Sequence, residues 1–71
     1  MTKEHLAKTV RALREKLQWS QERLAREADI STGYVARLEK GLHDPSLGTI
    51  EKLAGALKTS VSQLLGEKKQ K

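Results

Sequence analysis

Apolar residues recur at intervals of three and four positions along this chain, and this spacing constrains its fold more than any other feature. The first segment shows it at Leu6, Val10, Leu13 and Leu17, which lie four, three and four positions apart. Such spacing gathers side chains on one face of an α-helix, whereas a strand needs alternation at every second position. β-Branched and aromatic residues never alternate over a run here. We therefore expect an all-α protein.

Serine residues mark where the later helices are expected to begin. A first helix is expected from about Lys3 to Leu17, where the sequence QWS breaks the pattern. A serine side chain accepts a hydrogen bond from a free backbone N–H at a helix start, which predicts caps at Ser20, Ser31, Ser46 and Ser60. The third helix is expected from Thr32 to Lys40, stopping at a left-handed Gly41. Ser60 and Gln63 match a capping box that opens a fifth helix ending at Leu65.

Length and charge limit the organisation of the chain. Its 71 residues make one domain at most, with a thin core. We expect a compact five-helix bundle over residues 1–66 and a flexible basic tail over residues 67–71, which supplies +2 of the net charge of +5. The chain has no cysteine, no signal-peptide pattern and no long apolar run. These features predict a cytoplasmic protein without disulfides, thiolate metal sites or membrane contact.

The second and third predicted helices are separated by only a few residues. They must therefore cross steeply, as in a helix-turn-helix, with the small Ala25 at their closest approach. On a helical wheel, Val35 and Leu38 point inward, and the outward face carries Thr32, Gly33, Ala36, Arg37 and Lys40. Gly33 costs this helix about 1 kcal/mol relative to alanine. A bare face with one arginine suits entry into a DNA major groove; the alternative is a solvated face with a stray glycine.

A family resemblance favours the DNA interpretation. The segments SQERLA, STGYVARLEKG, PSLGTIEKLAGAL and SVSQLL follow one another between Val10 and Leu65. In this order and spacing they resemble the lambda-repressor-like helix-turn-helix family, also called the XRE family. The resemblance implies a sequence-specific DNA-binding transcriptional regulator, a dimeric repressor or controller protein that binds an inverted-repeat operator in double-stranded DNA. It would be associated with the nucleoid.

The resemblance also assigns roles to individual residues. It implies base-reading positions at Thr32, Gly33, Ala36 and Arg37, and phosphate contacts from Ser20, Gln21, Ser31, Tyr34 and Lys40. For Tyr34, a ring covering the edge of the core is an equal alternative. The family usually has a left-handed glycine where this chain has Asp29, which predicts some strain without a change of fold. Because Gly33 lacks a side chain that many relatives use, readout is expected to rest on Thr32 and Arg37, with DNA shape adding to it.

Two further positions match structural features of the family. Arg14 and Glu39 match a charge pair that ties the first helix to the third, and Glu39 lies on the inward flank beside Val35. An exposed pair of little energetic value is the alternative. Trp19, the only tryptophan, is expected to plug the core.

The last predicted helix is more apolar than one buried face requires. The family's use of this region implies a homodimer interface at Thr59, Gln63 and Leu64. This interface would set the third helices of the two protomers, which are the recognition helices that enter the DNA, about 34 Å apart. A monomer is the alternative.

Nothing in the sequence favours an enzyme. His5 and His43 lack helically spaced partners for a metal site, no Ser/His/Asp set or phosphate-binding glycine loop is present, and no cofactor is implied. The other functions left open are an antitoxin that holds a toxin and an RNA-binding or co-activator adaptor; a protein partner such as a toxin or polymerase is left open as well.

Overall fold

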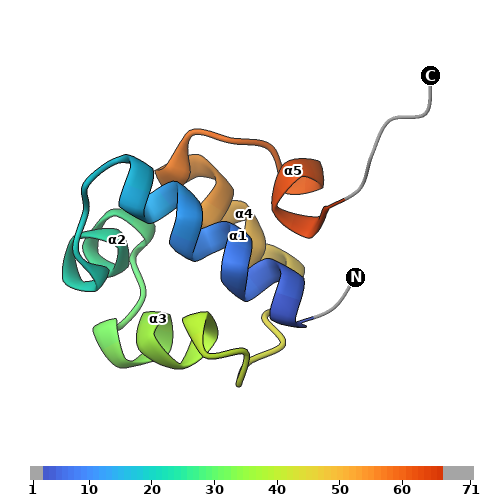
Figure 1. Ribbon diagram of the computed structural model, residues 1–71, viewed down its shortest axis with the longest axis horizontal. Helices are drawn as coiled ribbons and strands as arrows, with labels where there is room; N and C mark the ends of the chain where they lie inside the picture. The colour runs from blue at the N-terminus through green and yellow to red at the C-terminus, as the bar shows by residue number, and fades with distance from the viewer. Residues whose placement is uncertain (1–2, 67–71) are drawn as a thin grey trace.

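The computed structural model describes residues 3–66, and within them it contains five α-helices and no strand (Figure 1). The helices are α1 (Lys3–Lys16), α2 (Gln21–Ala28), α3 (Thr32–Glu39), α4 (Leu47–Leu57) and α5 (Val61–Leu65). The predicted all-α fold is confirmed. The first and third helices each end one residue earlier than predicted, because Leu17 and Lys40 already belong to the turns that follow. The predicted basic tail lies outside the described residues.

Serine caps open the last four helices, as the sequence predicts. The hydroxyl oxygens of Ser20, Ser31, Ser46 and Ser60 each accept a hydrogen bond from the backbone N–H three residues later, at 2.9–3.2 Å. Only one of the two hydrogen bonds of the capping box at α5 forms, the one from the N–H of Gln63 to the hydroxyl oxygen of Ser60. The side-chain oxygen of Gln63 accepts a hydrogen bond from Oγ1 of Thr59 at 3.2 Å instead of returning to Ser60.

Left-handed residues end several of the helices. Asp29 has φ 60° and ψ 47°, and Gly41 has φ 77°, as predicted; Gln18 and Lys58 also have positive φ, which the sequence does not announce. At Asp29 the turn closes with a hydrogen bond of 2.9 Å from the N–H of Ile30 to the carbonyl of Ala25. This tight turn lets α3 begin four residues after the end of α2 and cross it steeply.

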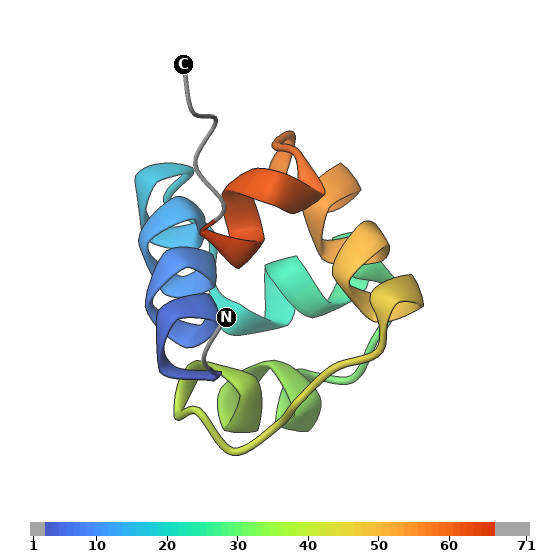
Figure 2. The same cartoon turned by 90° about the vertical axis from the view of Figure 1, so that its right-hand side faces the viewer.

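The core lies between all five helices. Its fully buried side chains come from every one of them: Leu6, Val10, Leu24, Val35, Leu38, Leu53 and Leu64. Trp19 packs against this core and is half-buried, with the guanidinium of Arg23 4.7 Å from the centre of its ring. Figures 1 and 2 both show α3 along the lower side of the molecule and α5 on the upper side. Because α3 packs against α1 and α2, its other side faces solvent.

Asp29 gives a first testable prediction, because its backbone conformation fixes the crossing of α2 and α3. A left-handed conformation costs an L-residue about 1–2 kcal/mol, and a β-branched side chain fits it worst. Asp29→Val is expected to lower the free energy of unfolding by about 1–2 kcal/mol, whereas Asp29→Gly and Asp29→Asn remain within about 1 kcal/mol of the original. Urea unfolding followed by circular dichroism measures this. If Asn were as damaging as Val, the carboxylate rather than the backbone would be the important feature.

Candidate nucleic-acid interface

The outward face of α3 is accessible along its whole length. Thr32, Gly33, Arg37 and Lys40 are exposed and Ala36 is half-buried, whereas Val35 and Leu38 have at most 1% of their surface exposed. The structure therefore places the four predicted base-reading positions on one open face. The first turn of this face carries only small side chains, which allows close approach of another molecule.

Arg37 lies back along α3 toward the start of the helix. A Cβ atom added at Gly33 would be 3.3 Å from Nη1 of Arg37, so the guanidinium rests over the bare glycine. Nε of Arg37 donates a hydrogen bond to Nε2 of His43 at 3.1 Å. The ring of His43 is stacked on that of Tyr34, with ring centres 4.4 Å apart and planes 10° apart.

His43 is the residue at this surface that sequence reasoning missed. Its place in a loop gives no helical spacing to Arg37, so the sequence predicts no contact between these two side chains. A usable signal was the left-handed Gly41, which turns the chain back onto the last turn of α3. The N–H of Leu42 donates to the carbonyl of Arg37 at 3.0 Å, and this bond brings the following residue alongside α3. Tyr34 also packs against the core, so its ring has both a core contact and a surface contact.

The predicted phosphate contacts lie at the starts of α2 and α3 and at the end of α3. The oxygens of Ser20 and Ser31 accept cap hydrogen bonds, which leaves both hydroxyl hydrogens free to donate. The backbone N–H of Gln21 is among the unsatisfied donors at the start of α2, a position that favours anions. Lys40 is exposed at the end of α3. The side chain of Gln21, however, is partly committed, since its Nε2 donates to Oε1 of Glu39 at 3.0 Å.

The structure brings Arg14 and Glu39 together in a pair joined by two hydrogen bonds. Nε of Arg14 lies 2.7 Å from Oε2 of Glu39, and Nη2 lies 3.0 Å from Oε1. The two side chains are only 11% and 4% exposed, so this is not the exposed pair that was the alternative. Nη1 of Arg14 also donates to the carbonyl of Trp19 at 2.6 Å. The hydrogen bond with Glu39 raises the pKa of Arg14 above its usual range, so the guanidinium stays charged wherever the protein is folded.

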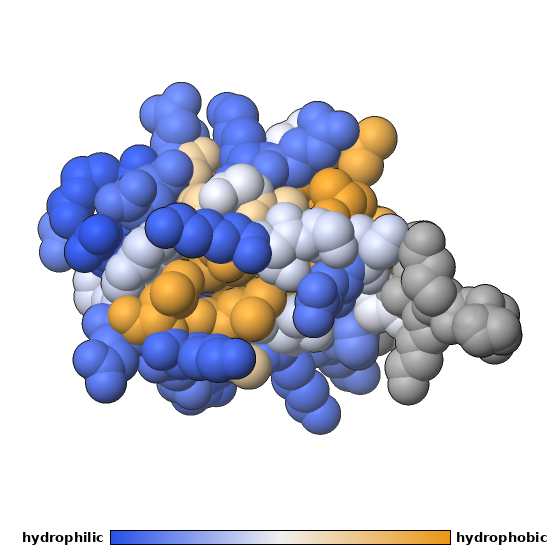
Figure 3. Space-filling view, turned by 90° about the horizontal axis from the view of Figure 1, so that it is seen from above, coloured by the Kyte–Doolittle hydropathy of each residue, from blue (hydrophilic) through white to orange (hydrophobic). Residues whose placement is uncertain are grey.

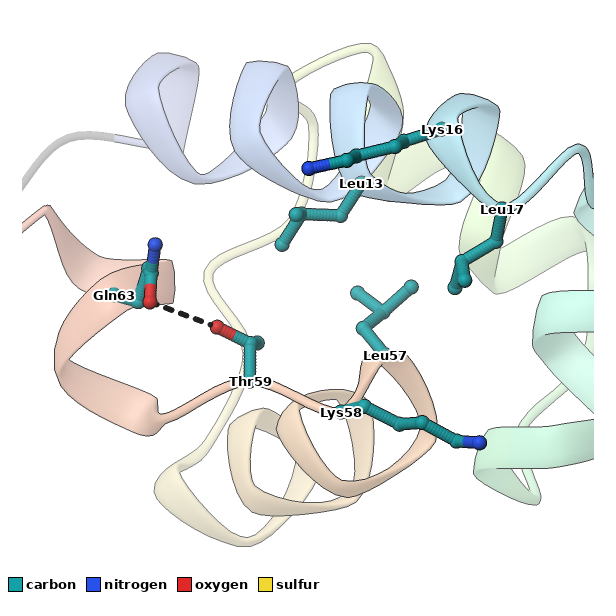
Figure 4. Close-up of a pocket in the computed structure, with 7 residues that line it drawn as sticks. All are labelled: Leu13, Lys16, Leu17, Leu57, Lys58, Thr59 and Gln63. Atoms are coloured by element: carbon teal, nitrogen blue, oxygen red, sulfur yellow. Dashed lines mark hydrogen bonds between the residues drawn. The ribbon is translucent and has the colours of Figure 1, made fainter.

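A second feature of the surface is a groove between the end of α1 and the connection from α4 to α5. Its lining, drawn in Figure 4, consists of Leu13, Lys16, Leu17, Leu57, Lys58, Thr59 and Gln63. Figure 3 shows an apolar patch on the same side of the molecule, away from α3. Thr59 and Gln63 lie at this groove. Leu64 does not, because it is fully buried, and the predicted dimer contact at Leu64 is corrected: its side chain completes the core.

The described residues offer no other obvious site. Among residues 3–66, no three histidine, aspartate or glutamate side chains are grouped so that they could hold a metal ion. None of the helices in this range has the length and apolar character needed to span a membrane.

The fold and the exposed face define a small helix-turn-helix protein, and comparison with known proteins gives its family. The helix-turn-helix family model HTH_3 matches residues 10–64, and the chain belongs to this family, which confirms the resemblance. It is 40% identical over 58 residues to the immunity repressor protein of Bacillus phage phi105, covering 82% of this chain and 40% of that protein. It is also 40% identical over 60 residues to a Neisseria hypothetical transcription factor from Neisseria meningitidis, covering 84% and 57%.

A solved structure shows the same fold over a whole small protein. The restriction-modification controller protein C.AhdI from Aeromonas hydrophila has a TM-score of 0.84 and 34% sequence identity. The match covers 87% of this chain and 94% of that one. By contrast, the chain spans only about half the length of the two curated relatives.

The pair between Arg14 and Glu39 gives a second prediction. Glu39→Gln removes the main carboxylate partner of the largely buried Arg14 and leaves it with the carbonyl of Trp19 and with the exposed carboxylate of Glu15 at 3.9 Å, which is expected to lower the free energy of unfolding by about 1–3 kcal/mol. The matched control is Glu27→Gln, which breaks the exposed pair of Glu27 with Arg23, whose side chains are 41% and 46% exposed. That change should cost less than about 0.5 kcal/mol. Thermal and urea unfolding measure both, and equal losses would contradict the importance of burial.

Proposed function

We propose that this protein is a sequence-specific DNA-binding transcriptional regulator that inserts α3 into the major groove. The observation that carries this proposal is the open face of α3, where Arg37 lies beside the small residues Gly33 and Ala36. The major groove is about 12 Å wide and admits one helix, and helices of this type read bases with residues near their N-terminal end. The names of the related proteins, an immunity repressor, a transcription factor and a controller protein, support the same role. The proposed role is binding rather than catalysis, in the cytoplasm.

Each part of the interface has a proposed task. Arg37 presents the forked donors that bind guanine through two hydrogen bonds, and Thr32 supplies a second, shorter polar group. Ala36 keeps the helix surface low enough for close approach to the bases, and Gly33 leaves room for the guanidinium of Arg37 over the first turn of α3. Phosphate contacts come from the hydroxyls of Ser20 and Ser31, the N–H and amide of Gln21, Tyr34 and Lys40. These contacts fix the register of the helix in the groove but carry no sequence information.

We also propose that the protein acts as a homodimer whose contact involves Thr59 and Gln63. Gln63 is exposed, and Leu17, which is 38% exposed, lines the opposite end of the same groove (Figure 4). A two-fold pair must turn both α3 helices toward the same duplex. The groove faces away from α3, so two protomers that met through the centre of the groove would point their α3 helices in opposite directions. We therefore propose that the protomers meet at the edge of the groove beside α5 (Figures 1 and 3). Two α3 helices about 34 Å apart would then read successive major grooves.

Selection of bound duplexes from a random pool tests the function and the pairing together. The expected result is an inverted repeat whose half-sites lie about 10 base pairs apart, with a guanine in each half-site. A single half-site without a repeat would contradict the dimer but not the function. Binding that weakens with salt yet enriches no sequence would contradict the function itself and favour an adaptor.

Substituting Arg37 and Gln21 separately by alanine distinguishes base reading from phosphate contact. Arg37→Ala is expected to cost about 1–3 kcal/mol of discrimination at one base pair per half-site. Gln21→Ala should weaken binding to every duplex alike, because the proposed contacts of Gln21 are with the phosphate backbone of DNA. Affinities for the selected site and its single-base variants, measured by fluorescence anisotropy, give both quantities.

Two controls accompany this comparison. Arg11→Ala removes one positive charge from the exposed side of α1, outside the interface, and should leave the discrimination unchanged. Because Gln21 also contacts Glu39, the unfolding of each variant must be measured beside its affinity. If Arg37→Ala and Gln21→Ala both lowered affinity uniformly, the assignment of Arg37 as a base reader would be wrong.

A further inference from the structure

We propose that His43 is a positioning residue that holds Arg37 ready to read a base, an inference that rests on the proposed DNA-binding function. His43 is not part of α3. It lies in the loop after it, and its only described partners are Arg37, through a hydrogen bond of 3.1 Å, and the ring of Tyr34. Both partners are on the recognition helix. The loop thus holds the side chain of Arg37, at the centre of the exposed face of α3, from outside the helix.

The loop is itself fixed against α3, so His43 has a defined place. The N–H of Gly41 donates to the carbonyl of Leu38, and the N–H of Leu42 donates to the carbonyl of Arg37, each at 3.0 Å. These bonds close the left-handed turn at Gly41 and bring the imidazole over Tyr34. Stacking on Tyr34 then fixes the plane of the ring, so that Nε2 faces the guanidinium.

The hydrogen bond leaves the reading end of Arg37 unused. To accept from Nε of Arg37, the imidazole must be neutral, with its hydrogen on Nδ1. The bond occupies one of the five N–H donors of the guanidinium, and the four on Nη1 and Nη2 remain for a base. Those four are the donors that form a fork on guanine. The bond to His43 therefore leaves both Nη groups of Arg37 available to a base.

Gly33 leaves the space in which the guanidinium of Arg37 lies. Because it has no side chain, the guanidinium can lie over the first turn of α3, where bases are read. An arginine side chain has several rotatable bonds, and fixing them costs conformational entropy at the moment of binding. The hydrogen bond with His43 fixes part of this freedom before DNA arrives, which improves affinity for the correct base without any new contact to DNA.

The first arm of the test needs no DNA. In the free protein, the Nε–H of Arg37 should give a resolved proton–nitrogen signal in NMR spectra, protected from exchange by its bond to His43. His43→Phe keeps a ring to stack on Tyr34 but removes the acceptor, and it should shift this signal and speed its exchange. His43→Gln, which keeps an acceptor, should restore part of the protection. A signal unchanged in His43→Phe overturns the inference.

The second arm is a double-mutant cycle on the selected duplex. His43→Phe is expected to reduce discrimination at the Arg37 base pair about three- to tenfold, the effect of one net hydrogen bond, while thermal unfolding stays unchanged. In the Arg37→Ala background, the same change should leave discrimination unaffected, because no arginine remains to be positioned.

The outcomes of the cycle are distinct. Equal loss of affinity for all duplexes in both backgrounds would mean that His43 contacts phosphate, and it overturns the inference while leaving the proposed function intact. If the unsubstituted protein prefers no duplex sequence, the proposed function is contradicted, and the role of His43 in base reading is contradicted with it. The NMR signal still reports whether His43 holds Arg37 in the free protein.

Discussion

The ion pair between Arg14 and Glu39 is the contact on which the rest of the interface depends. α3 has only two fully buried side chains, Val35 and Leu38, and these alone do not fix its rotation. Glu39 anchors its last turn to α1 through Arg14, and to the start of α2 through Gln21. Arg14 also holds the carbonyl of Trp19, so the α1–α2 connection shares the same anchor. Charges taken out of water are stabilising only when all their hydrogen bonds are satisfied, and no buried side-chain nitrogen or oxygen in the described residues lacks a partner.

The features that could be predicted from the sequence are those set by near neighbours along the chain. The apolar spacing of α1 and the caps at Ser20, Ser31, Ser46 and Ser60 involve groups three or four residues apart, and their geometry hardly depends on the rest of the fold. The left-handed turn at Asp29 belongs to the same class, because few residue types tolerate that conformation. Even the open face of α3 follows from one helical period. Local rules were therefore sufficient for the order of the helices and for the direction in which α3 faces, although not for the left-handed residues Gln18 and Lys58.

Contacts between distant side chains could not be obtained in this way. Gln21 and Glu39 are 18 positions apart, and their hydrogen bond exists only because the caps and turns bring two helix ends together. His43 meets Arg37 because Gly41 reverses the chain, and no spacing rule describes a loop residue beside a helix. The error at Leu64 has a different origin. On a helix of five residues, Val61, Leu64 and Leu65 occupy overlapping directions, and only the packing of α1 and α4 decides which one is buried.

Gly33 shows how the anchor and the reading face depend on each other. A glycine inside an eight-residue helix costs about 1 kcal/mol, a loss that such a short helix could not absorb alone. The anchoring of α3 at Glu39 and the burial of Val35 and Leu38 make its stability largely independent of helix propensity. The position is thereby free to leave space for the guanidinium of Arg37, whose Nη1 would lie 3.3 Å from a Cβ atom there and would have to shift slightly. A weak position in the recognition helix is thus tolerated because the opposite end of that helix is held firmly, and the room it leaves is where the proposed base-reading arginine lies.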